Sequence, residues 1–89
     1  MANILDVKTN LAQRVRARRR EAKLSQSALA QRSSVSLGSV KRFEGSGEIS
    51  LTSLLRIAAV LGYVTDFDKL FERRNYQSLE EVLNAKQTA

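Results

Sequence analysis

The chain has 89 residues, 43% of them hydrophobic, which is enough for one domain with a small core. It contains no cysteine and no histidine, so a disulfide framework, thiolate chemistry and the commonest acid–base catalyst are all excluded. Fifteen Lys and Arg against nine Asp and Glu give a net charge of +6, which favours a polyanionic partner.

The first predicted elements are an N-terminal arm over residues 1–8 and a helix of about four turns that follows it. The apolar positions of this helix have helical spacing: Leu11, Ala12, Val15 and Ala22. Its basic residues are Arg14, Arg16, Arg18, Arg19 and Arg20. This arginine-rich segment either keeps the surface soluble or meets a polyanion.

Residues 24–44 contain two short helical patterns joined by a turn. Serines are placed to cap both helices, at Ser25 and Ser36. The inward-facing positions are Leu29 and Ala30 in the first helix and Val40 and Phe43 in the second. Residues 32–35 leave room only for a tight turn, with Val35 as the apolar side chain beneath it. Helices this short are not stable alone, because nucleation is costly, so they must pack on neighbours.

The next segment has the pattern of a buried helix, with an apolar stripe at Leu51, Leu54, Leu55, Ile57, Ala58 and Leu61. Ser50 is a natural cap for it, and Ile49 and Leu54 have the spacing of a hydrophobic staple. Gly62 lies where a left-handed residue would end the helix.

A fifth short helix is predicted over residues 65–72. Thr65 is its expected cap, Asp68 follows three residues later, and the expected inward residues are Phe67, Leu70 and Phe71. The five helices together predict an all-α domain over residues 9–72.

A tail over residues 73–89 follows the predicted domain. Ser78-Leu79-Glu80-Glu81 is a capping-box pattern that predicts another short helix. The apolar residues of the tail could cover the domain, join a dimer or fold onto a partner protein: Tyr76, Leu79, Val82 and Leu83. The acidic pair makes the tail a poor DNA contact.

The sequence argues against an enzyme and against a membrane protein. The serines lie at predicted helix caps and in the turn, where backbone hydrogen bonds account for them. No glycine-rich phosphate loop or cluster of metal ligands is present, so we expect no cofactor and no metal. Charges interrupt every apolar stretch and the N-terminus lacks a signal-peptide pattern, so we expect a cytoplasmic protein with no membrane partner.

From about residue 11 to residue 71 the chain resembles the phage-repressor and Cro type of helix-turn-helix regulators, the XRE family. The most specific matches are Leu24-Ser25-Gln26, Leu29-Ala30, Val35-Ser36, the run 40–44 and the run 54–62. The resemblance implies a five-helix, repressor-like DNA-binding domain in which the helix after the turn enters the major groove.

The resemblance also implies a set of DNA-binding residues. In the family, the glutamine that matches Gln26 opens the second helix and holds the DNA backbone. The family's groove-facing positions correspond to Ser36, Leu37, Gly38, Ser39, Lys41 and Arg42, and the predicted DNA-binding set is completed by Gln26, Ser27 and Arg32. Periodicity supports part of this set independently, because residues 37, 38, 41 and 42 face outward if Val40 and Phe43 face the core.

Single residues of the recognition helix leave alternatives open. Arg42 either grips guanine bidentately or clamps a phosphate, whereas Lys41 suits a backbone contact. Leu37 either meets a thymine methyl or packs along the edge of the core. Gly38 either lets the backbone approach the DNA closely or marks a site with few side-chain contacts.

Arg19 and Glu44 match an arginine and a glutamate that form a structural ion pair in the family, between the first helix and the end of the third. Two departures bear on DNA affinity. Ser34 stands where the turn usually has glycine, so this residue must adopt an unusual conformation or the turn must differ. Glu48 would repel phosphate if it faced the DNA.

The predicted function is a transcriptional regulator, most simply a repressor, that binds a palindromic operator in double-stranded DNA as a homodimer. The alternative is an antitoxin or adaptor that uses the same fold to dock a toxin or another partner protein, since the tail resembles that of some antitoxin-type members. Strong salt dependence of binding to arbitrary DNA would favour the regulator. Saturable protein binding without DNA binding would favour the adaptor.

Overall fold

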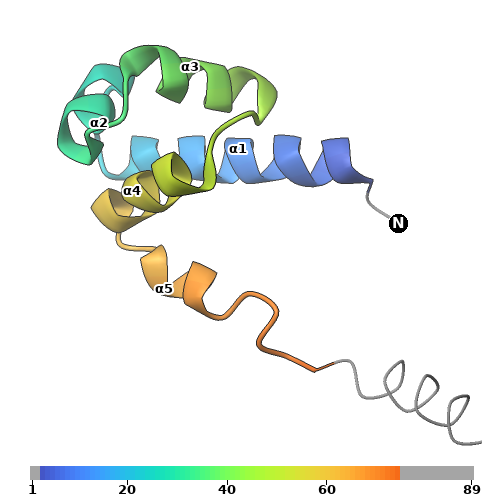
Figure 1. The fold of residues 1–89 in the computed structure, drawn as a ribbon. Coiled ribbons are helices and arrows are strands. Elements are labelled where there is room, and N and C mark those ends of the chain that lie inside the picture. The colour runs from blue at the N-terminus through green and yellow to red at the C-terminus, as the bar shows by residue number, and fades with distance from the viewer. Residues whose placement is uncertain (1–2, 75–89) are drawn as a thin grey trace, which may run out of the picture.

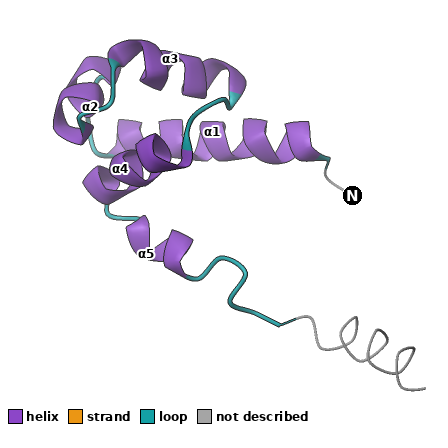
Figure 2. Cartoon of the chain, viewed as in Figure 1, coloured by secondary structure: helices purple, strands orange, loops and turns teal. Residues whose placement is uncertain are grey.

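The computed structural model describes residues 3–74, and within them the chain forms five helices and no strand (Figures 1 and 2). The helices are α1 (Ile4–Glu21), α2 (Gln26–Ser33), α3 (Leu37–Ser46), α4 (Leu51–Leu61) and α5 (Val64–Asp68). This confirms the predicted all-α class. No helix of the described part is long and apolar enough to cross a bilayer. The helix predicted from the capping box at Ser78 lies outside the described residues.

Helix α1 begins earlier than predicted, because residues 4–8, expected to be part of an arm, belong to this helix. Asn3 caps the helix and its side chain accepts a hydrogen bond of 2.8 Å from the backbone N–H of Asp6. Asp6 also places a negative charge in the first turn, where the helix dipole favours it. At the other end the helix stops at Glu21, and Ala22 is an exposed C-cap rather than an inward residue.

The predicted caps of α2, α3 and α4 are confirmed. The hydroxyls of Ser25, Ser36 and Ser50 each accept a hydrogen bond from the backbone N–H three residues later, at 3.0, 3.1 and 3.1 Å. Gly62 is left-handed and ends α4 as predicted. Each helix end is therefore set by a local signal, and the three helices start in the register that buries their apolar faces.

Two groups of buried side chains form the core. The first joins α2, α3 and α4 and consists of Leu29, Ala30, Val35, Val40 and Ile57. The second joins α1, α3 and α4 and consists of Ala12, Phe43 and Leu54. Val15 and Ile49 pack against both groups, and Ile49 thus lies against the group that contains Leu54, which is consistent with the predicted staple. The core thus fixes α3 from two sides.

Helix α5 differs from its prediction. It begins at Val64, its N-cap is Tyr63 without a side-chain hydrogen bond, and Thr65 is not the cap. The left-handed turn at Gly62 lets the N–H of Tyr63 bond to the carbonyl of Ala58 at 2.8 Å, which leads the chain into α5 at once. The helix ends at Asp68, so Leu70 and Phe71 are 60% and 101% exposed rather than inward.

The helices lie on two sides of α1. Figure 1 shows α3 on one side of α1 and α5 on the other, with α4 between α1 and α5. Helix α3 and helix α5 therefore lie on opposite sides of α1.

Candidate nucleic-acid interface

Helix α3 has one buried face and one open face. Val40 and Phe43 are buried at 0% and 1% exposure and hold the helix to the core. Gly38, Lys41 and Arg42 are exposed on the other face, at helical spacings of three and four residues. The open face thus combines the exposed backbone at Gly38 with the two cations Lys41 and Arg42.

The serines at the start of α3 are engaged with each other. Ser36 is the exposed N-cap, and its hydroxyl also donates to the hydroxyl of Ser39 at 2.8 Å. Ser39 is half-buried. These two hydroxyls therefore organise the first turn of the helix, and each keeps hydrogen-bonding capacity for a further partner.

Leu37 is half-buried and packs against the core group of α2, α3 and α4. Of the two interpretations left open by the sequence, packing along the core edge is the one that this position favours. Gly38, by contrast, is open, and a Cβ built there meets no atom within 4 Å.

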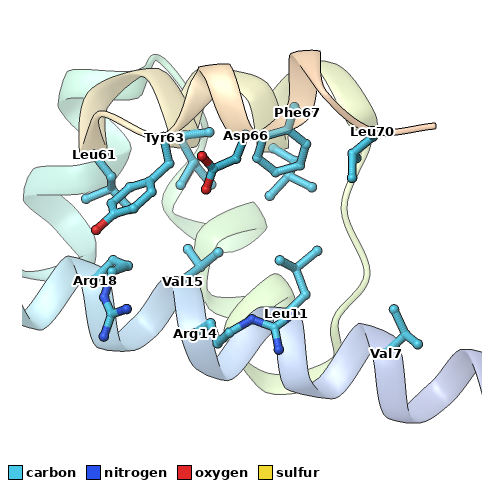
Figure 3. Close-up of a pocket in the computed structure, with 13 residues that line it drawn as sticks. Val7, Leu11, Arg14, Val15, Arg18, Leu61, Tyr63, Asp66, Phe67 and Leu70 are labelled. Carbon is cyan, nitrogen blue, oxygen red and sulfur yellow. The ribbon is translucent and has the colours of Figure 1, made fainter. Parts of the chain in front are cut away.

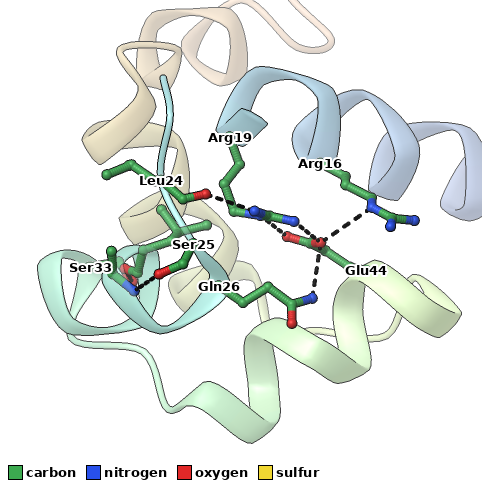
Figure 4. Close-up of polar contacts among 9 residues, drawn as sticks. Arg16, Arg19, Leu24, Ser25, Gln26, Ser33 and Glu44 are labelled. Carbon is green, nitrogen blue, oxygen red and sulfur yellow. Dashed lines mark hydrogen bonds and ion pairs between the residues drawn. The ribbon is translucent and has the colours of Figure 1, made fainter. Parts of the chain in front are cut away.

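A buried ion pair anchors the end of α3 to α1. Arg19 donates from Nε to Glu44 Oε2 at 2.7 Å and from Nη2 to Glu44 Oε1 at 2.9 Å (Figure 4). The side chains of the two residues are 9% and 4% exposed. A bidentate arginine–carboxylate pair of this kind fixes both distance and orientation between two helices.

Glu44 also reaches α2, which the sequence analysis did not predict. Gln26 donates from Nε2 to Glu44 Oε1 at 3.1 Å, and Arg16 Nε lies 3.9 Å from the same oxygen (Figure 4). Arg19 further donates from Nη1 to the carbonyl of Leu24 at 2.7 Å, at the entry to α2. One carboxylate therefore ties α3 to both α1 and α2.

The surroundings of Glu44 change its acidity. Burial acts to raise the pKa of the carboxyl, but the hydrogen bonds from Arg19 and Gln26 and the charges of Arg19 and Arg16 outweigh it, so the pKa is held below its ordinary value. The hydrogen bond to Glu44 likewise raises the pKa of Arg19. Glu44 is therefore ionised throughout the neutral range.

The turn between α2 and α3 contains the unusual residue that the sequence indicated. Ser34 has a φ of 58° and ends α2 in the left-handed conformation that glycine adopts without cost. Ser33 before it is buried, and its hydroxyl donates to the carbonyl of Leu29 at 2.7 Å. The turn is thus kept with serine in place of glycine, and Val35 is buried beneath it as predicted.

The remaining predicted contact residues lie at the ends of α2. Gln26 and Ser27 open the helix, with Ser27 exposed and Gln26 half-buried against Glu44. Arg32 is exposed in the last turn. The start of α2 and the open face of α3 thus supply polar and basic groups from two adjoining helices.

Glu48 is an acidic residue beside the open face of α3. It shares a small polar cleft with Arg42, Ser39 and Ser53. Its carboxylate forms an ion pair with Lys8 of α1. Because Lys8 offsets its charge, Glu48 opposes an approaching phosphate less than the sequence suggested.

Comparison with known families gives one match. A helix-turn-helix family model matches residues 15–67, which is more than half of the chain and runs from within α1 to within α5. No curated protein and no solved structure matches the chain.

Proposed function

The chain belongs to the XRE-type helix-turn-helix family of DNA-binding regulators, and from that premise we propose that it is a sequence-specific repressor that binds a palindromic operator as a homodimer. The recognition helix is α3, which lies in the major groove.

The exposed face of α3 is the observation that carries this proposal. Gly38, Lys41 and Arg42 stand together on a helix whose other face is fully buried. The Glu44 network fixes the direction of this helix relative to α1 and α2. A rigid, basic helix of three turns suits the width of the major groove.

The contact residues have different roles in this proposal. Arg42 reads a base, because a guanidinium can donate to guanine O6 and N7 at once. Lys41 and Arg32 bind phosphates, and Gln26 and Ser27 bind the backbone at the start of α2. Gln26 can do so while it bonds to Glu44, because its amide keeps one N–H and its carbonyl oxygen.

Dimerisation supplies the affinity that one small domain lacks. Two linked recognition helices bind two half-sites whose centres lie one turn, about 34–36 Å, apart. Pairing the domains makes the second contact effectively intramolecular. Repression then follows from exclusion of the polymerase from the occupied site.

Arg42→Ala and Lys41→Ala distinguish base reading from phosphate binding. The duplex is one selected from a random pool, and the competitor is an unrelated duplex of equal length. We expect Arg42→Ala to weaken binding to the selected duplex by about 1–3 kcal/mol more than binding to the unrelated one, because a bidentate base contact is lost.

Lys41→Ala is the matched control, since Lys41 is the exposed neighbour of Arg42. It should weaken binding to both duplexes equally. It should also reduce the slope of the salt dependence of binding by the share of about one phosphate contact. Fluorescence anisotropy at several salt concentrations measures both effects. Equal losses on the two duplexes for Arg42→Ala would show that Arg42 is a phosphate contact.

A further inference from the structure

An apolar groove runs between α1 and α5 (Figure 3). Helix α5 lies on the side of α1 away from α3 (Figure 1). Val7, Leu11 and Val15 form one wall, and Phe67 and Leu70 form the other. The floor comes from α4, and the open volume is about 400 Å³. None of the predicted DNA-binding residues lines it.

The mouth of the groove is unusually apolar for a free surface. Val7 is 51% and Leu70 is 60% exposed, and Ile4, Leu5 and Phe71, which are close to them in the chain, are more exposed than either. Large apolar side chains gathered around a concave site mark a place where another apolar segment packs.

The α1 wall of the groove is also positively charged. Arg14 and Arg18 line it, and Figure 3 shows Tyr63 pointing toward Arg18 across the groove. Arg18 donates from Nη2 to Glu21 at 2.7 Å, but its Nε is buried and has no hydrogen-bond partner within residues 3–74. A buried donor of this kind calls for an acceptor, and a carboxylate is the best one for a guanidinium.

We propose that residues 78–84 of the same chain dock in this groove as a sixth helix. Leu79, Val82 and Leu83 have the i, i+3, i+4 spacing of helix-in-groove anchors. On such a helix Glu80 lies beside the apolar stripe, where it meets the basic wall at Arg14 and Arg18. The segment thus supplies both an apolar stripe for the groove and a carboxylate for its basic wall.

The length of the chain allows this docking. Leu70 already lies at the groove, where the chain turns, because the N–H of Glu72 bonds to the carbonyl of Lys69 at 3.1 Å. Residues 73–77, between this turn and the segment, can span about 16 Å when extended. The α1 wall from Val7 to Arg18 is about 16 Å long. The segment can therefore reach any part of the groove, and its attachment to α5 gives it a high effective concentration over the tail of a second copy.

A spin label on the tail tests the proposal in the full chain. Because the protein has no cysteine, Glu81→Cys provides a single labelling site, on the side of the helix away from the anchors. We expect the nitroxide to broaden amide signals of the groove walls, such as those of Val7, Leu11 and Leu70, and to leave those of Lys41 and Arg42 sharp.

Two controls make the result decisive. Adding Leu79→Asp and Val82→Asp to the labelled chain should remove the broadening at the groove, while the signals of the core stay in place. In the second control, spin-labelled chain that lacks nitrogen-15 is mixed with nitrogen-15 chain that lacks the spin label. This mixture should show no broadening. Broadening that survives the aspartates overturns docking through these anchors, and broadening in the mixed sample assigns the groove to the tail of a second copy, which overturns docking within one chain.

Discussion

At the scale of single residues, Glu44 has the largest influence on the recognition helix. Its carboxylate accepts hydrogen bonds from Arg19 of α1 and Gln26 of α2, and its side chain is almost fully buried. A buried pair of this kind is weak evidence of net stability, but removing one partner leaves an uncompensated charge. The pair therefore acts as a positional constraint on α3.

Arg19→Ala is expected to lower the free energy of unfolding by about 3–5 kcal/mol, because Glu44 then stays buried without its cation. Arg16→Ala is the matched control on the same helix. Arg16 is 50% exposed and lies 3.9 Å from Glu44, so its loss should change stability by less than about 1 kcal/mol. Urea denaturation of both variants measures the difference, and equal small effects would refute the structural role of Arg19.

The depressed pKa of Glu44 also predicts a pH dependence. A carboxyl with a lowered folded-state pKa contributes stability above its ordinary value of 4.5, and this contribution is lost as the pH falls below 4.5 through the folded value. Wild type should therefore exceed Glu44→Gln in stability at neutral pH, and the gap should narrow on acidification. Urea denaturation of both proteins from pH 7 to pH 3 tests this, and a gap that does not change with pH would contradict it.

At the scale of elements, the sequence predicts best where the signals are local. The starts of α2, α3 and α4 follow from serine caps, and the end of α4 follows from Gly62, because caps act within one turn. The start of α1 and the extent of α5 were not predicted from such local signals. Asn3 caps α1 outside the apolar pattern, and Leu70 and Phe71 have helical spacing without a core to receive them.

The candidate site also has one part that the sequence predicts and one part that it does not. The open face of α3 follows from periodicity, since Val40 and Phe43 determine which residues face outward. The contact of Arg19 with Glu44 was implied only by the resemblance, and that of Gln26 with Glu44 not at all. These residues are 25 and 18 positions apart, and no local signal in a single sequence joins such distant positions.

Gly38 tests whether the backbone of α3 approaches DNA closely. A Cβ at Gly38 meets nothing within 4 Å, so Gly38→Ala should stabilise the free protein by about 0.5–1 kcal/mol through its effect on helix propensity. In the proposed complex the added methyl group would lie between the helix and the groove floor, so we expect the same variant to bind the selected duplex more weakly.

Gly45→Ala is the comparison for this prediction. Gly45 lies on the same open face of α3 with open space around it, but in the last turn, so alanine there should also stabilise the helix while lying farther from the N-terminal residues that contact base edges. Thermal unfolding and anisotropy on the two variants separate helix propensity from DNA contact. Unchanged DNA binding by Gly38→Ala would show that Gly38 merely marks a site with few contacts.

At the scale of the whole molecule, the two sides of α1 have different characters. One side has α3 with its exposed cations, and the other has the apolar groove beside α5. A segment docked in the groove therefore leaves the DNA-binding face free. The net charge of +6 adds a field that attracts DNA of any sequence, so in the proposed function the sequence preference is assigned to the open face of α3.

Selection from a pool of randomised duplexes shows whether the protein binds DNA in a sequence-specific way. The full chain is incubated with the pool at moderate salt, with an unrelated duplex as competitor, and the bound sequences are determined. A homodimeric regulator should select a two-fold symmetric motif whose half-site centres lie about 10–10.5 base pairs apart. Recovery of no sequence above the competitor would contradict sequence-specific regulation and would favour a protein partner for this fold.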